Sequence, residues 1–456
     1  MILRRRTSKA HPATVVLATF LLAVAVGTVL LELPIATRAG SIPLIDALFT
    51  ATSAVCVTGL TVVDTGSCYT TFGQMVILAL IQLGGLGVMT ISVILFRWIG
   101  RSVSFRHRMV MQDLFAHTPR EDIFSLIKNI VVVTFLVEAS GAALLAIHWS
   151  GEMPFGKALY SGVFHSVSAF CNAGFALFSD SMVRYSDDFL LNLTICALIV
   201  IGGIGFPVLY DLQTWMVRRR RTRVRLTIQT KTVLLTTGVL IAAGWLLFAY
   251  LERLSLGQNP SMAHRFLVPL FQSVTCRTAG FNTVDIGSLQ DATLALMLFL
   301  MFFGASPGSC GGGVKTTTLA LVAAFTWTRI RRKRRVNMFK KSIPSETVHR
   351  SLTLILVSIG IISFILFMLL MGNTGDLRTA GEGHSFLAYF FETVSAFGTV
   401  GLSMGITPKL STWGKSWIVV AMLIGRIGVL AFSYIIIGAG TMTEGIEHAE
   451  ENIMIG

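Results

Sequence analysis

Four short segments of the chain share a pattern of residue types that is suited to binding a bare cation. Each segment begins with Phe, has Ser or Thr four residues later, and reaches a Gly nine or ten residues after the Phe. The segments are FTATSAVCVTGLTVVDTG (49–66), FHSVSAFCNAGFALFSDS (164–181), FQSVTCRTAGFNTVDIG (271–287) and FETVSAFGTVGLSMGIT (391–407). Glycine permits backbone angles that turn carbonyl oxygens toward one point, and a ring of carbonyl oxygens can replace the water shell of an ion. The pattern predicts that a dehydrated cation is coordinated near Gly59, Gly174, Gly280 and Gly401.

Three of the four segments also carry an acidic residue five or six residues after the glycine, namely Asp64, Asp180 and Asp285. Acids at the mouth of a cation path raise the local cation concentration, although ordinary loop acids explain them almost as well. The fourth segment has Gly405-Ile406-Thr407 in this region. The sequence gives no reason for the missing acid.

The elements that position these segments must lie in a membrane. Of the 456 residues, 53% are hydrophobic and 13% are charged, with a mean hydropathy of +0.72, whereas a soluble protein carries roughly 25% charged residues. Runs of about 20 apolar residues, the length that spans a bilayer, predict eight spans at 13–33, 73–96, 126–148, 189–216, 232–251, 290–303 with 318–328, 351–371 and 415–440. We expect the first run to be a span, because it is too long for the apolar part of a signal peptide.

The positive charge of the chain is placed as the topology of a membrane protein requires. Most of the 37 Lys and Arg residues lie in 1–12, 97–125, 218–231 and 329–350, which alternate with pairs of spans. By the positive-inside rule, we expect a multi-pass plasma-membrane protein with both termini in the cytoplasm. Because membrane topology explains where the positive charges lie, the net charge of +14 does not indicate nucleic acid binding, and we expect no nucleic acid partner. The run RIRRKRR (329–335) could contact anionic lipid or an acidic partner, but topology explains it more simply.

Each glycine segment lies between two spans on the side opposite the basic loops. Irregular backbone at membrane depth must be shielded by protein or line water. We therefore expect four half-helices, near 43–56, 155–170, 263–275 and 383–396, whose negative C-terminal ends point at one axis. The predicted fold is an all-α polytopic membrane protein with four repeated units, each a helix, a pore half-helix and a second helix, arranged with pseudo-fourfold symmetry around one central pore. The predicted units are 1–105, 106–225, 226–345 and 346–456.

Two motifs in the third unit mimic enzyme signatures. GASPG (304–308) matches the G-x-S-x-G nucleophile pattern, which leaves an intramembrane serine protease using Ser306 as a distant alternative. The candidate bases His165 and His384 fall in the outer half-helices, and no third partner is evident. GSCGGGVKT (308–316) departs from a P-loop because Val314 precedes Lys315. The six cysteines have no metal-ligand spacing, so we expect packed, reduced thiols, no enzyme and no covalently bound cofactor.

With these residues established, the chain resembles the Trk/Ktr/HKT superfamily of potassium transporters, and most closely the Ktr-type membrane subunit. The resemblance extends over essentially the whole chain. The motifs that carry it are IDALFTATSAVCVTGLTVVDTG, SVSAFCNAGF, SVTCRTAGFNT, GGGVKTTT, SAFGTVGL and IGRIG.

The resemblance implies a selectivity filter that binds potassium as the substrate. Its positions are Val57, Thr58, Gly59, Asn172, Ala173, Gly174, Thr278, Ala279, Gly280, Thr399, Val400 and Gly401. In this family a serine at the first filter glycine accompanies sodium transport, so Gly59 favours potassium. Sodium or poorly selective monovalent-cation transport remains the alternative, and potassium transport could itself depend on sodium.

The resemblance also implies an intramembrane gating loop at 304–317, where the sixth span is interrupted. The gate residues are Ser309, Cys310, Gly311, Gly312, Gly313, Lys315 and Arg426; a kinked helix without a gating role is the alternative. Of the other intramembrane charges, Glu138 is expected to contact a neighbouring helix, and Arg277 to brace the loop from behind the filter.

The resemblance to Ktr-type membrane subunits further implies a homodimer that sits on a cytoplasmic ring of nucleotide-binding regulatory subunits. The chain has no G-x-G-x-x-G after a strand. We therefore expect such a regulator to be a separate protein.

Overall fold

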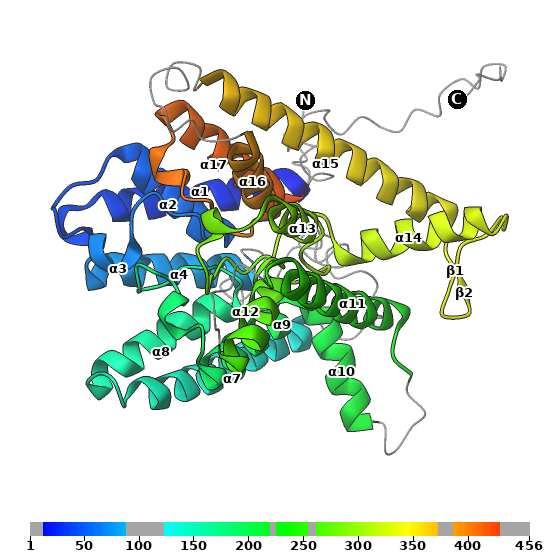
Figure 1. Cartoon of the computed structure of the whole chain (residues 1–456), viewed down its shortest axis with the longest axis horizontal. Helices are drawn as coiled ribbons and strands as arrows, with labels where there is room; N and C mark the ends of the chain where they lie inside the picture. Colours follow the sequence, from blue (N-terminus) through cyan, green and yellow to red (C-terminus); the bar gives the residue numbers. More distant parts are fainter. Residues whose placement is uncertain (1–11, 88–122, 219–224, 254–260, 373–385, 429–456) are drawn as a thin grey trace, which may run out of the picture.

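The computed structural model describes residues 12–87, 123–218, 225–253, 261–372 and 386–428 (Figure 1). These residues are helical apart from their loops and one small hairpin, β1 (Asn337–Met338) with β2 (Lys341–Ser342). The expectation of an all-α architecture is confirmed.

The helices follow the same order four times along the chain: a long helix, a half-helix and a second, shorter helix. The first set is α1 (Pro12–Glu32), α2 (Leu44–Cys56) and α4 (Thr71–Leu86), and the second is α7 (Ile123–Trp149), α8 (Phe155–Phe170) and α9 (Phe189–Gly203). The third set is α11 (Ile228–Leu251), α12 (Met262–Thr275) and α13 (Asp291–Phe302), and the fourth is α15 (Ser345–Gly372), α16 (Phe386–Gly398) and α17 (Thr412–Ile427). The four predicted half-helices are confirmed as α2, α8, α12 and α16, with ends within three residues of those expected.

Shorter elements complete the chain. They are α3 (Thr65–Cys68), α10 (Phe206–Arg218), α14 (Thr316–Ile330) and the 3-10 turns Pro34–Ala36, Val183–Tyr185, Ile286–Ser288 and Thr407–Lys409.

The four sets pack in a closed order. The second helix of each set contacts the half-helix of the next: α4 contacts α8, α9 contacts α12, α13 contacts α16, and α17 returns to α2. In Figure 1 the blue, teal, green and yellow-to-orange parts accordingly follow one another around the middle of the molecule. The C-terminal ends of the half-helices are therefore held by neighbours on both sides.

Three helices in the described ranges are long and apolar enough to cross a bilayer: Lys128–Trp149, Ile228–Leu251 and Ser345–Gly372. α9 and α10 are long and apolar enough only when taken together, and they are bent by 97° at the break between them. The run 189–216 is therefore not one continuous helix, contrary to the prediction. The break contains Gly205, which has a φ of +95°. This angle lies outside the right-handed helical region and is accessible mainly to glycine.

The second helices of the first and fourth sets end in the same way. α4 ends at Gly87 (φ +80°) and α17 ends at Gly428 (φ +92°), so neither predicted span continues past these glycines as one helix. The remainders of 73–96 and 415–440 lie outside the described residues.

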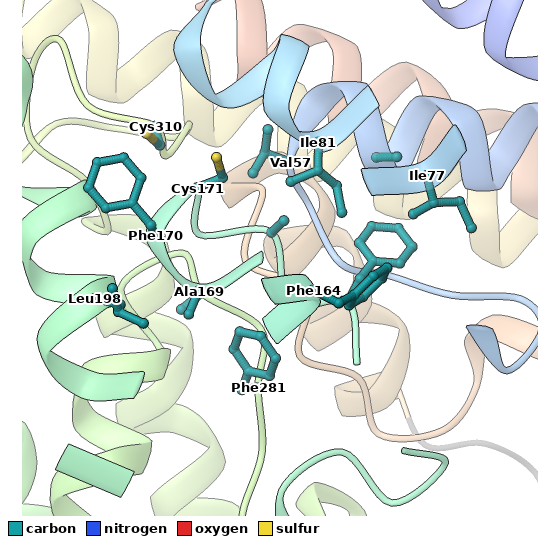
Figure 2. Packing of buried hydrophobic residues seen from close by; sticks show 14 of the residues in the cluster. Val57, Ile77, Ile81, Phe164, Ala169, Phe170, Cys171, Leu198, Phe281 and Cys310 are labelled. Carbon is teal, nitrogen blue, oxygen red and sulfur yellow. The ribbon is translucent and has the colours of Figure 1, made fainter. Parts of the chain in front are cut away.

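The buried core reaches into the glycine segments themselves. Figure 2 shows Val57, Ala169 and Cys171, at the ends of two half-helices, in the same hydrophobic cluster as Ile81 and Phe281. All five side chains are fully buried. The backbone at the half-helix ends is thus fixed by close packing.

Candidate functional site

The four glycines predicted to coordinate a cation line one cavity. This cavity has a volume of about 170 Å³, and its polar lining comes from the stretches that follow the glycines. The lining residues are Gly59, Thr61, Asp64, Thr65, Gly174, Ala176, Phe178, Ser179, Ser181, Gly280, Asn282, Ile286, Gly401, Leu402 and Ser403. We call it the mouth cavity. Residues far apart in the sequence are therefore brought together as the repeated pattern predicts.

The backbone before each glycine has the same unusual conformation in all four segments. The residue two positions ahead of the glycine is left-handed each time: Val57 (φ +57°), Asn172 (φ +57°), Thr278 (φ +67°) and Thr399 (φ +50°). The glycines themselves have φ of +91°, +69°, +80° and +91°. A left-handed residue with a side chain costs roughly 1–2 kcal/mol, and such strain persists only where the surroundings enforce it. The same strained conformation in all four segments indicates that the backbone itself has a functional role at this site.

The glycines are packed so closely that none has space for a side chain. A Cβ on Gly59 would lie within 2.7 Å of the carbonyl oxygen of Ala173, and the same holds for Gly174 against Ala279, Gly280 against Val400, and Gly401 against Thr58. Each glycine thus meets the carbonyl of the residue before the next segment's glycine, and the fourth segment returns to the first. The four segments form a closed ring, which we call the glycine ring.

The shared Ser or Thr of each segment holds the ring backbone by a hydrogen bond. Ser53 Oγ accepts from the N–H of Gly59, and Ser395 Oγ accepts from that of Gly401, both at 3.1 Å. Ser168 Oγ donates to the carbonyl of Phe175 (2.8 Å), and Thr275 Oγ1 donates to that of Phe281 (2.6 Å). The repeated hydroxyl is thus explained as a brace for the turn after each half-helix.

The small residues of the second helices are explained by close approach to the half-helix ends. Gly84, Gly202 and Gly425 lie against the carbonyl oxygens of Val55, Phe170 and Phe397, where a Cβ would overlap the oxygen. Each of these carbonyls belongs to the residue four positions before a ring glycine.

The 304–317 loop lies on the side of the glycine ring opposite the mouth cavity. It contacts residues that precede the glycines: Gly311 lies against Thr278, and the N–H of Gly312 donates to Thr399 Oγ1 (2.8 Å). Its backbone is also tied to two second helices, because the N–H of Ser306 donates to Gly203 O (3.2 Å) and that of Gly313 to Gly425 O (3.3 Å). The loop therefore spans the base of the ring.

Two basic side chains hold this loop. Arg426 donates from Nη1 to the carbonyl of Cys310 and from Nη2 to the carbonyl of Gly84. Lys315 Nζ donates to Gly311 O (2.8 Å) and Gly312 O (3.3 Å). Lys315 is therefore turned onto the loop. The side chain of Ser309, the remaining predicted gate residue, donates to Ser306 O (2.7 Å).

The expectation for Arg277 agrees with its position behind the ring. Its side chain is 4% exposed and donates to Gly304 O (3.3 Å) and Thr237 Oγ1 (3.1 Å). It thereby connects the third segment to the start of the 304–317 loop.

Glu138 also makes the neighbouring-helix contact that was expected of it. Its carboxylate accepts from Gln82 Nε2 at 3.1 and 3.3 Å.

The three outer aspartates each have a local structural partner. Asp64 Oδ1 accepts from the N–H of Ser67 (2.6 Å), and Asp285 Oδ1 from that of Gly287 (3.0 Å). Asp180 pairs with Arg184 (2.9 Å), whose hydrogen bonds lower the pKa of the Asp180 carboxyl. Only Asp64 lines the mouth cavity within the described residues. The loop-acid explanation fits Asp180 and Asp285 well.

No catalytic arrangement surrounds Ser306 in the described residues. Its Oγ lies 3.0 Å from Thr316 Oγ1. His165 uses both ring nitrogens elsewhere, because Nδ1 donates to Ser161 O (2.8 Å) and Nε2 accepts from the N–H of Leu177 (3.2 Å). His384 lies outside the described residues.

The six cysteines are free thiols, and no group of three metal-binding side chains occurs in the described ranges.

Sequence reasoning missed one set of site residues. The position directly after the shared Phe is buried and polar in every half-helix, and it is occupied by Thr50, His165, Gln272 and Glu392. Because the four residue types differ, the repeat does not reveal them. Only the common offset from the Phe could have done so.

Comparison with known proteins agrees with this geometry. Ktr system potassium uptake protein B of Vibrio alginolyticus is 38% identical over 455 residues, which cover 99% of this chain and 97% of that protein. The protein of the same name from Bacillus subtilis is 38% identical over 429 residues, covering 93% and 92%. Potassium/sodium uptake protein NtpJ of Enterococcus hirae is 35% identical over 459 residues and covers both chains completely.

The fold resembles that of a solved transporter. The crystal structure of the potassium transporter TrkH from Vibrio parahaemolyticus superposes with a TM-score of 0.72 at 18% identity, covering 95% of this chain and 86% of that one. The TrkH family, described as "Cation transport protein", matches residues 4–441. A family of transporters leaves no basis for the protease alternative. The chain is a multi-pass membrane protein that belongs to the TrkH family of cation transport proteins.

Proposed function

We propose that the protein takes up potassium ions through the glycine ring, which acts as its selectivity filter. The observation that carries this proposal is the closed contact of each ring glycine with the carbonyl of the next segment. A ring of backbone carbonyls at the ends of four half-helices suits a dehydrated monovalent cation, because helix C-termini carry partial negative charge. The names of the relatives from Vibrio alginolyticus and Bacillus subtilis support potassium as the ion.

The proposed filter residues are those of the sequence prediction, with a pseudo-fourfold pore built from units 1–105, 106–225, 226–345 and 346–456. Potassium loses its water in the mouth cavity and passes Gly59, Gly174, Gly280 and Gly401. The path then continues past Thr58, Ala173, Ala279 and Val400 and reaches the 304–317 loop.

The loop is proposed to be the gate. It lies across the base of the ring and contacts Thr278 and Thr399 directly. Its hydrogen bonds run to the backbone of two second helices, α9 and α17, and to the side chains of Arg426 and Lys315. Displacing the loop breaks these backbone hydrogen bonds and those donated by the side chains of Arg426 and Lys315. A loop rich in glycine can make this change at small steric cost.

The surroundings of the pore complete the proposal. The basic segments favour a plasma-membrane protein with both termini in the cytoplasm. The protein is proposed to act as a homodimer on a separate nucleotide-binding regulator.

A second candidate is sodium transport, or potassium transport that depends on sodium. The name of the Enterococcus hirae relative, a potassium/sodium uptake protein, favours keeping this candidate.

The experiment is growth rescue of potassium-uptake-deficient cells at low potassium, with and without sodium and with and without a co-expressed Ktr-type regulatory subunit. We expect rescue by the wild-type chain and uptake of rubidium that potassium inhibits. Failure to rescue under all four conditions, with the protein present in the membrane, would contradict the proposal. The second candidate would be favoured if growth at low potassium were rescued only when sodium is present and if potassium did not inhibit the uptake of sodium.

A further inference from the structure

The residue after the shared Phe connects each half-helix to the stretch beyond its glycine. The four hydrogen bonds are Tyr69 Oη to Thr50 Oγ1 (3.2 Å), Leu177 N to His165 Nε2 (3.2 Å), Gln272 Nε2 to Thr283 Oγ1 (3.2 Å), and Thr407 Oγ1 to Glu392 Oε1. All four side chains are at most 2% exposed. The same structural position thus carries four different chemical groups around one ring.

Glu392 is the one carboxylate among these four residues. It is 0% exposed, and its Oε2 has no hydrogen-bond partner among the described residues. No Lys, Arg or His in the described ranges forms an ion pair with it. A buried carboxylate without a compensating charge is costly. Burying Glu392 thus costs free energy of folding, and a residue kept at such a cost is a candidate for a functional role.

A line of hydrogen-bond donors leads from the mouth cavity to this carboxylate. The N–H of Gly405 donates to Ser403 Oγ (3.0 Å), Ser403 Oγ lies 3.1 Å from Thr407 Oγ1, and Thr407 Oγ1 donates to Glu392 Oε1. Ser403 itself lines the mouth cavity. With Gly405 donating to it, the Ser403 hydroxyl proton is free to point to Thr407. In this orientation both hydroxyl dipoles run toward Glu392 and stabilise the ionised form of its carboxylate.

Glu392 contacts the stretch in which the fourth segment lacks an acid. The first three segments have an aspartate after the glycine, and the fourth has Gly405, Ile406 and Thr407 there. Thr407 is the residue that contacts Glu392. The fourth segment thus has its negative group on the half-helix behind the loop, reached through a threonine.

We propose that Glu392 supplies the fixed negative charge of the fourth segment and sets the affinity of the mouth cavity for the transported cation. It acts through Thr407 and Ser403 and touches no ion itself, so it is a positioning and affinity-determining residue. The cation in the cavity in turn supplies the positive charge that the buried carboxylate lacks. This inference rests on the proposed function, because it concerns the affinity of the same transport path.

The main test is Glu392→Gln, which keeps the size of the side chain and an oxygen that accepts from Thr407 but removes the charge. Initial rates of rubidium uptake are measured against external concentration in cells. We expect the half-saturation concentration to rise on the order of tenfold, as loss of one nearby charge predicts, while the maximal rate stays within about twofold. Glu392→Asp, which retains the charge, should remain closer to the wild type.

A relocated charge separates the electrostatic role from a merely structural one. Gln272→Glu places a carboxylate at the same position of the third segment, where the Thr283 hydroxyl can donate to it. Added to Glu392→Gln, it should return the half-saturation concentration toward the wild-type value. Alone, it should lower that concentration below the wild-type value. The single Gln272→Glu variant also tests the proposal if Glu392→Gln does not accumulate in the membrane.

Two results would overturn the inference while leaving the proposed function intact. One is a Glu392→Gln variant with wild-type half-saturation. The other is a Gln272→Glu charge with no effect, either alone or in the double variant. If the wild-type chain takes up neither potassium nor rubidium, it is the proposed function that fails, so the two failures are distinguishable.

Discussion

The guanidinium of Arg426 binds two carbonyl oxygens that belong to different sets of helices. Nη1 donates to Cys310 in the 304–317 loop, and Nη2 donates to Gly84 in α4. Arg426 itself lies in the last turn of α17. One side chain therefore joins the first, third and fourth sets at the base of the glycine ring. Arginine suits this position because it stays charged and offers several donors in a fixed geometry.

Replacing Arg426 should increase uptake. Arg426→Gln removes a positive charge from the proposed cation path and two hydrogen-bond donors from the loop region. Both the electrostatic barrier and the anchoring of the loop should therefore decrease. The rate rises on the order of tenfold for each ~1.4 kcal/mol by which the barrier falls. The initial rate of rubidium uptake measures this effect. Arg350→Gln, at an exposed pair with Glu346, is the control and should be unchanged; equal rates in the two variants would contradict the role of Arg426.

Joining the loop to the ring should stop transport. The side chains of Cys171, at the end of α8, and Cys310, in the loop, belong to the same buried cluster (Figure 2). Mild oxidation with copper phenanthroline and oxygen removes two protons and two electrons and leaves a disulfide. We expect most rubidium uptake to be lost on oxidation and regained with dithiothreitol.

The control for this cross-link is Cys310→Ser, which should make uptake insensitive to the oxidant. Cys196→Ser removes another buried thiol and should leave the sensitivity in place. Full uptake by the wild type after the cross-link has been verified by mass spectrometry would show that the loop need not move.

A side chain on a ring glycine should alter selectivity. Gly59→Ser places a Cβ against the carbonyl of Ala173, which must shift and so changes the coordination of the ion. We expect sodium permeability to increase relative to potassium, measured as the ratio of uptake rates. Gly40→Ser carries a similar φ of +76° with no atom within 4 Å, and so controls for backbone strain alone. An unchanged ratio in Gly59→Ser would argue against Gly59 as a filter residue.

Two glycine-to-alanine substitutions should have opposite effects on stability, because one glycine is closely packed and the other faces open space. Gly202→Ala puts a Cβ into the carbonyl of Phe170 and should destabilise the protein by about 1–3 kcal/mol through overpacking. Gly360→Ala, in α15 with no atom within 4 Å, should stabilise it by about 0.5–1 kcal/mol, because alanine favours helix. Thermal unfolding in detergent measures both. A Gly202→Ala variant as stable as the wild type would mean that α9 approaches α8 less closely.

Much of this architecture could be predicted from local sequence. The half-helices were found within three residues because four segments repeat the same Phe, hydroxyl and glycine spacing, and each copy supports the others. The role of the glycines in the second helices could not be predicted from the sequence. It depends on which carbonyl lies opposite, and only the packed structure shows that Gly202 faces Phe170.

Other features could not be predicted because they arise between segments. The break at Gly205 was missed because the run 189–216 has the average hydropathy of a span, and hydropathy does not register a backbone angle. The closure of the ring from Gly401 to Thr58 is a contact between the two ends of the chain. Glu392 was overlooked because its meaning comes from Thr407 and Ser403, which reach it only after the loop has folded back.

The most direct test of the account is to locate the ion. Crystals of the wild-type protein grown with rubidium in place of potassium are measured for anomalous diffraction at the rubidium edge. The account predicts an anomalous peak on the axis between Gly59, Gly174, Gly280 and Gly401. Rubidium peaks elsewhere in the protein, with none at the glycine ring, would contradict it.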